Sequence, residues 1–219
     1  MTVYIAFPAS EKLHRNTLAF SEAVEKQPGV IHQQLIDEIS HDFISEVLAA
    51  FFDGPVQSLN MQGSMASVMN GVMTIIGKAS RALVNKVFHK VSVEEQAMLV
   101  REFLAMQIIA NDAPHCGFPL EPSVASRAAT MFEGFRAGQG NEDELVTIMG
   151  LYADGAIEYF FDRTLGAVKV GAITRGLVGA GRGTIHKAAH STMQKSLPGL
   201  HPKVRQPVLN YFESMMIEV

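Results

Sequence analysis

The segment RGTIHKAAH (182–190) carries two histidines one helical turn apart. The i, i+4 spacing places His186 and His190 on one face of a helix, where two imidazoles can bind a metal ion. A metal site also needs a third protein ligand, and the spacing alone is common. We therefore expect no metal and no other cofactor. His186 and His190 are kept as weak metal-ligand candidates, with a metal-dependent enzyme as an alternative function.

The histidine pair belongs to a longer basic stripe. Arg182, His186 and His190 follow one another at steps of four, and RALVNKVFH (81–89) has the same pattern with Asn85 in place of the first histidine. An arginine binds phosphate or carboxylate through two parallel hydrogen bonds, and histidine adjusts such a site near neutral pH. The stripes predict an anion-binding surface, with an ordinary solvated helix face as the alternative. The candidate ligand-binding residues are Arg81, Lys86, His89, Arg182, Lys187 and His190.

The glycines ahead of this stripe, in GLVGAGRGT (176–184), raise the question of a phosphate-binding loop. A P-loop requires G-x-x-x-x-G-K-[ST] after a strand, and a dinucleotide fold requires G-x-G-x-x-G between a strand and a helix. Neither spacing is present. Small residues also let two helix backbones approach closely, and we favour this interpretation.

Several motifs occur twice in the same order. FP occurs at 7–8 and 118–119, and FFD at 51–53 and 160–162. Each FFD is followed by a segment without acidic residues, from Asp53 to Glu94 and from Asp162 to Glu213. These matches predict an internal duplication, with one repeat over 1–112 and the other over 113–219. We expect the phenylalanines to be core residues at a helix end. The two aspartates should cap the next element or pair with a basic residue of the glycine region.

The chain reads as helices separated by proline and glycine. Ser10 is a predicted N-cap, and Ser92 with Glu95 is a predicted capping box. A long helical region from 55 to 90 should be interrupted near 70–71, and 114–122 should be a loop. Only TVYIAF (2–7) is typical of a strand. We predict an all-α fold: two tandem repeats of about four helices each, packed about a pseudo-twofold axis as one compact unit.

Composition narrows the functional classes. Hydrophobic residues make up 47% and charged residues 18%, which supports a packed core. The net charge of −4 gives no general case for nucleic acid. The single cysteine, Cys116, excludes an internal disulfide, and a bland loop position is expected for it. The N-terminus has no secretory pattern and no segment has the apolar length of a membrane span, so we expect a cytoplasmic protein.

No nucleophile–base motif stands out. The prediction is a non-catalytic helical binding or interaction protein that recognises an anionic ligand or a protein partner through its basic helix faces. An alternative is a membrane-surface protein, because MASVMNGVMTIIGKASRALVNKVFHK (65–90) runs from apolar to basic residues. A homodimer is a further candidate assembly, and nucleic acid is the least favoured partner.

Overall fold

The computed structural model describes residues 1–58, 64–89, 91–198 and 200–219. The chain is mostly helical, and it also contains one small antiparallel sheet, which corrects the all-α prediction. The strands lie in the order β2-β3-β1-β4. Their bounds are β1 (Val3–Pro8), β2 (Gln107–Ala110), β3 (Ala113–Pro119) and β4 (Met216–Glu218).

The predicted loop at 114–122 is mostly strand β3, which pairs with β1 on one side and β2 on the other. Its prolines and glycine are typical of a loop, but Pro114 and Pro119 lie at the strand ends, where a missing N–H is tolerated. Asn111 and Asp112 both have positive φ, as the tight turn of a β2–β3 hairpin requires. Cys116 therefore lies in a strand, and burial raises the pKa of its thiol well above the usual value.

Helices make up most of the rest of the described chain. The predicted N-cap Ser10 and the Ser92/Glu95 capping box are both confirmed. The predicted break near 70–71 is wrong, because one helix runs through it. The helices are α1 (Glu11–Lys26), α2 (Gln33–Leu48), α3 (Gly54–Ser58), α4 (Ser64–Phe88), α5 (Val93–Ala105), α6 (Pro122–Arg136), α7 (Glu142–Ile157), α8 (Arg163–Gly166), α9 (Ala172–Ser196) and α10 (Pro202–Ser214).

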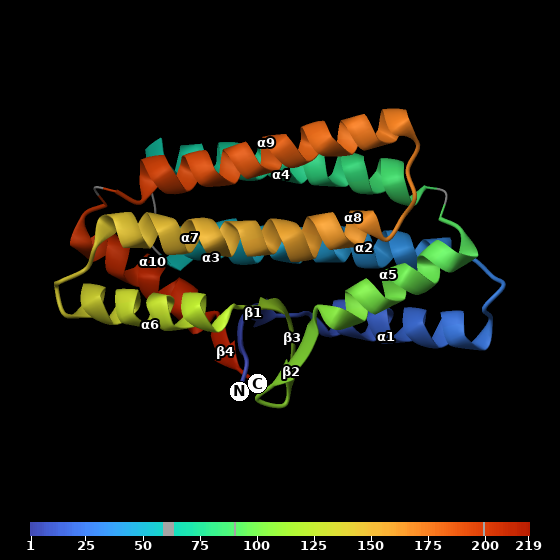
Figure 1. The fold of residues 1–219 in the computed structure, drawn as a ribbon, viewed down its shortest axis with the longest axis horizontal. Coiled ribbons are helices and arrows are strands. Elements are labelled where there is room, and N and C mark those ends of the chain that lie inside the picture. Colours follow the sequence, from blue (N-terminus) through green and yellow to red (C-terminus); the bar gives the residue numbers. More distant parts are fainter. Residues whose placement is uncertain (59–63, 90, 199) are drawn as a thin grey trace.

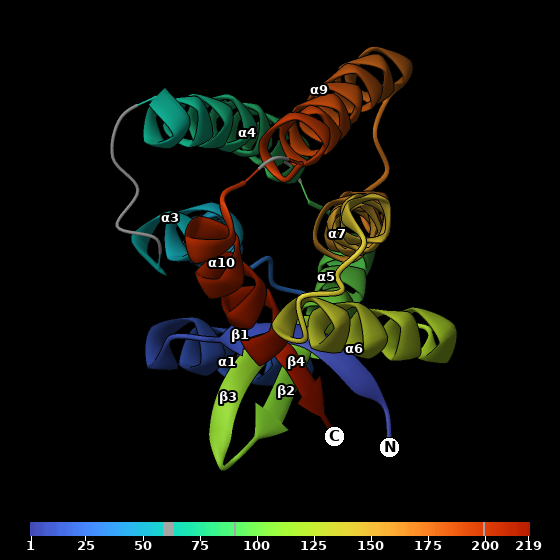
Figure 2. The same cartoon turned by 90° about the vertical axis from the view of Figure 1, so that its left-hand side faces the viewer.

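The elements form layers. α4 and α9 lie side by side in an outer layer, on the side of the molecule away from the sheet (Figures 1 and 2). Beneath them run α2 with α3 and α7 with α8, and the sheet lies at the opposite side with α1 and α6 (Figure 1). No helix in the described ranges has the length and apolar character needed to cross a membrane.

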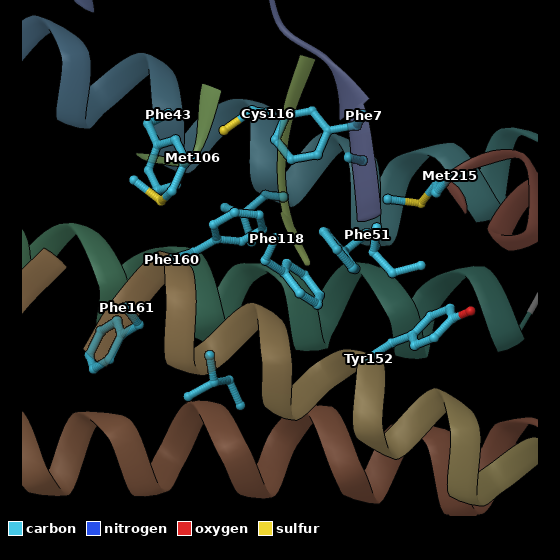
Figure 3. Packing of buried hydrophobic residues seen from close by; sticks show 14 of the residues in the cluster. Phe7, Phe43, Phe51, Met106, Cys116, Phe118, Tyr152, Phe160, Phe161 and Met215 are labelled. Atoms are coloured by element: carbon cyan, nitrogen blue, oxygen red, sulfur yellow. The ribbon is translucent and has the colours of Figure 1, made fainter. Parts of the chain in front are cut away.

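One hydrophobic core joins the two halves of the chain. The ring of Phe160 lies at its centre and contacts Phe7, Phe43, Phe51 and Phe118 with centroid separations of 5.3–6.2 Å (Figure 3). All four of these contacts are edge-to-face, a geometry that aromatic rings prefer. The core therefore connects the sheet to the middle helical layer.

Candidate functional site

Each FFD segment forms a π-helical turn rather than a helix end. These turns are η1 (Ala49–Asp53), between α2 and α3, and η2 (Glu158–Asp162), between α7 and α8. In each, the residue after the turn donates its N–H to a carbonyl five residues back. The prediction of core phenylalanines is confirmed for Phe51, Phe160 and Phe161, whereas Phe52 is half-buried. π-turns often mark functional sites, and these phenylalanines all line one cavity.

The cavity has a volume of about 110 Å³ and lies between the outer and middle helical layers. α4 and α9 cover it, while α2, α7 and the two π-turns form its base and walls. The lining is apolar apart from three hydroxyl side chains, Ser40, Ser80 and Thr164. An apolar cavity of this size suits a hydrocarbon chain or ring better than water.

Two of the lining hydroxyls are buried without a partner. Ser40 and Thr164 are each only 4% exposed, and neither hydroxyl oxygen has a hydrogen-bond partner among the described residues. A buried unpaired hydroxyl costs about 1–3 kcal/mol. Helical Ser and Thr residues usually bond to the carbonyl four residues back, as Thr17 does here. The cavity thus offers two hydroxyl groups that a ligand could satisfy.

The layer that covers the cavity is basic. Residues 64–88 and 172–196, which form α4 and α9, contain no aspartate or glutamate, although the whole chain carries a net charge of −4. Arg81 and Lys86 of α4 are exposed, and so is Lys187 of α9. Because no acidic residue balances these cations, the layer above the apolar cavity carries a net positive charge.

The predicted anion-binding residues face two different sides. Arg182 of α9 forms an ion pair with Asp162 of η2, with its Nε 2.8 Å from both carboxylate oxygens. This confirms that Asp162 pairs with a basic residue of the glycine region. Arg81 of α4 lies on the α2 side, since its Nη1 adjoins Gly77, which Leu48 of α2 also approaches. Arg81 and Arg182 therefore lie against different neighbours.

Asp154 of α7 is the functional candidate that sequence reasoning missed. Its Oδ1 lies 2.7 Å from Nε2 of His190 and 3.3 Å from Nε2 of His186. A detectable signal was present: Asp154, Glu158 and Asp162 follow at steps of four, like the residues of the basic stripe. Two antiparallel stripes of opposite charge on neighbouring helices indicate facing side chains.

The close-packing interpretation of the glycines holds at one position. A Cβ on Gly181 would overlap the side chain of Leu83, so this glycine lets α9 approach α4 closely. The ideal Cβ positions of Gly176, Gly179 and Gly183 meet no atom of another segment within 4 Å. Since α9 is continuous through these residues, the segment is a helix and not a phosphate loop.

Comparisons with protein-family models, curated proteins and solved structures gave no match. The geometry of the cavity, its basic cover and the Asp154 cluster must therefore carry the functional argument. Of these, the cavity involves the most elements and brings both halves of the chain together.

Proposed function

We propose that this protein is a non-catalytic binding protein for a small anionic amphiphile. The apolar part of the ligand enters the cavity, and its anionic group contacts the basic residues of α4. The observation that carries the proposal is an apolar cavity whose cover consists of two helices without acidic residues.

The α2–α4 side is the proposed entrance. Val47 and Phe52 of the lower layer and Ser80 and Val84 of α4 are half-buried members of the lining. Arg81 follows Ser80 directly, is exposed, and lies on the α2 side of α4. An anionic head group at this entrance would meet the Arg81 guanidinium, which forms no ion pair with any described residue. This geometry favours Arg81 as the residue that binds the anionic group. The charge of Arg182 is already balanced by the Asp162 carboxylate.

The binding free energies show why the ligand needs both an apolar part and an anionic group. Burying about 120 Å² of apolar ligand surface contributes about 3 kcal/mol. A dissociation constant of about 1 mM corresponds to about 4 kcal/mol, so the apolar part alone binds weakly. The contact between the anionic group and arginine must supply the rest, and this contact is weakened by salt.

Calorimetric titration with octanoate and 1-octanol tests the proposal, because the two share an apolar chain and differ in charge. Octanoate should bind more tightly, and added salt should weaken only octanoate. Ala189→Phe, which fills the cavity, should abolish both signals, while Ala180→Phe on the exposed side of α9 should preserve them. Unchanged octanoate binding by a folded Ala189→Phe protein would remove the cavity from the proposal.

A second candidate function is docking to an anionic membrane surface. Ile75 of α4 is 50% exposed, and Ile173 and Leu177 of α9 are 85% and 49% exposed. Exposed apolar side chains on basic helices suit an interfacial position. Sedimentation with anionic vesicles at low salt, reduced by Ile173→Ser with Leu177→Ser, would support it. An absence of binding to such vesicles would exclude it.

We further propose that the halves 1–112 and 113–219 are duplicated units related by a pseudo-twofold axis. The strand register supports this. A twofold axis that exchanges β1 with β3 relates Phe7 to Phe118 and Ile5 to Cys116. It converts the strand pair Phe7–Cys116 into the pair Phe118–Ile5, and both pairs are present. Exchanging β4 with β2 as well converts Ile5–Met216 into Cys116–Gln107, and both are again present.

Exchanging the order of the halves tests the duplication. The backbone of Thr2 pairs with that of Val219, so an Asn-Gly linker there would mimic the β2–β3 turn at 111–112. A chain that starts at residue 113 and ends at residue 112 should fold, and its free energy of unfolding should lie within about 2 kcal/mol of the original value. The reason is that the new chain ends lie at a hairpin turn and interrupt no buried backbone. Failure of this permuted chain to fold would contradict the symmetric arrangement.

A further inference from the structure

We propose that Asp154, His186 and His190 form a binding site for one Zn²⁺ ion at the α7–α9 interface. The three donor atoms come from two helices and all lie within 4.8 Å of one another. The site is independent of the amphiphile, since none of the three residues lines the cavity.

The two separations between the Asp154 carboxylate and the histidine nitrogens are close to those of tetrahedral coordination. Zinc binds histidine nitrogen and carboxylate oxygen at about 2.0–2.2 Å, so two tetrahedral ligands lie about 3.3 Å apart. The Oδ1 of Asp154 is 3.3 Å from Nε2 of His186 and 2.7 Å from Nε2 of His190. A small rotation of the carboxylate would make the two separations equal.

The two imidazoles are already oriented alike. Their rings stack with centroids 4.2 Å apart and an angle of 22° between their planes, and both Nε2 atoms approach the same carboxylate oxygen. One helical turn on α9 fixes this parallel arrangement. Since the lone pairs of two stacked rings run nearly parallel, at least one imidazole must rotate about its side-chain torsions before both Nε2 atoms and the Asp154 carboxylate can bind one ion.

The charges around the three residues and their exposure to solvent also suit a zinc ion. Along the same interface, Arg182 is neutralised by Asp162, and the exposed Glu158 lies between Asp154 and Asp162 in the sequence. The side chains of Asp154, His186 and His190 are 48%, 44% and 24% exposed, so water can reach a fourth coordination position. Two histidines, one carboxylate and one water form a ligand set that zinc commonly adopts.

A plain hydrogen-bonded cluster, in which one carboxylate oxygen accepts from both imidazoles, is the competing explanation. Titration of chelator-treated full-length protein with ZnCl₂, without any amphiphile, separates the two. We expect one Zn²⁺ per chain, and Co²⁺ in the same site should give the visible absorption of tetrahedral cobalt. Absence of stoichiometric zinc binding would overturn the proposal.

Substitutions then assign the ligands. His190→Gln and Asp154→Asn should each lower zinc affinity at least about tenfold, because loss of an outer-shell partner alone costs about 10–100-fold. His89→Gln at the end of α4 is the matched control and should bind zinc normally. Zinc should also raise the melting temperature of the original protein and of the control, but not of the ligand variants. Normal zinc affinity in folded Asp154→Asn would overturn the assignment.

Discussion

The two helices of the outer layer carry the same basic spacing against different neighbours. On α9, Arg182 and His190 lie against carboxylates of η2 and α7. On α4, Arg81, Asn85 and His89 have the same spacing, and all three are exposed. The difference shows that a pattern on one helix does not define a site. The side chains of the facing helix decide whether a basic residue is neutralised by a carboxylate or stays available to a ligand.

The two π-turns are also held differently. In η1, the carbonyl of Ala50 accepts a 2.7 Å hydrogen bond from the Tyr211 hydroxyl of α10. Its partner five residues on would be Pro55, which has no N–H to donate. The residue that follows η2, Arg163, is instead bound by Glu102 of α5. A neutral hydrogen bond from a half-buried side chain therefore supports one turn, and an ion pair at the surface supports the other.

The largest expected effect concerns the phenylalanines of the two π-turns. Phe160→Ala should lower the free energy of unfolding by about 3–5 kcal/mol, because its ring fills the space between Phe7, Phe43 and Phe118. Phe51→Ala should cost about 1 kcal/mol less, since Phe51 lies at the edge of that cluster. Urea unfolding of both variants measures the difference. Equal losses would mean that the two turns contribute equally to the core.

The next effect tests how η1 is held. A Cβ on Gly54 would overlap the Tyr211 ring and hydroxyl, so Gly54→Ala should displace the tyrosine and cost about 1–3 kcal/mol. Gly166→Ala at the end of α8, where a Cβ meets no neighbour, is the control. In a Tyr211→Ala background the cost of Gly54→Ala should largely disappear. If both costs add without coupling, Tyr211 is not the group that requires glycine.

The helices could be predicted from sequence because local rules decide them. The Ser92/Glu95 capping box formed as the spacing indicates, and burial of Glu95 is outweighed by hydrogen bonds from the backbone N–H groups of Ser92 and Lys169, which keep its pKa below the usual value. Strand β1 confirms the strand predicted at 2–7, but the rest of the sheet could not be predicted in this way. Strands β2 and β4 are only a few residues long, and their pairing with β3 and β1 is fixed by long-range packing rather than by local pattern.

In the candidate site, too, local sequence patterns identified some residues, and tertiary packing decided the others. The FFD segments drew attention to the correct residues, but the π-turns that direct Phe51 and Phe160 into one cavity depend on tertiary contacts. The histidine pair could be found by its i, i+4 spacing, whereas Asp154 lies more than thirty residues away and becomes a neighbour only when α7 packs on α9. The acidic spacing of Asp154, Glu158 and Asp162 gives a matching stripe, but packing, and not spacing along one helix, decides that α7 faces α9.

A smaller effect distinguishes the glycines of α9. Gly183→Ala should raise the free energy of unfolding by up to about 1 kcal/mol, because alanine favours the helix and the added methyl group meets open space. Gly181→Ala should give little or no gain, since its methyl group would overlap Leu83 of α4. Thermal unfolding of the two single variants makes the comparison. An equal gain at both positions would show that close α4–α9 contact does not require glycine.

The smallest effect returns to the two arginines. Arg182→Gln removes an ion pair with partly exposed partners and should cost about 0.5 kcal/mol, a loss that disappears in 1 M salt. Arg81→Gln should leave stability unchanged but weaken octanoate binding, because its charge remains available for the ligand. Arg101→Gln, an exposed position on α5, is the control for both measurements. If Arg182→Gln weakens octanoate binding and Arg81→Gln does not, the anionic group lies on the α9 side. The assignment of α4 as the ligand-facing helix would then be wrong.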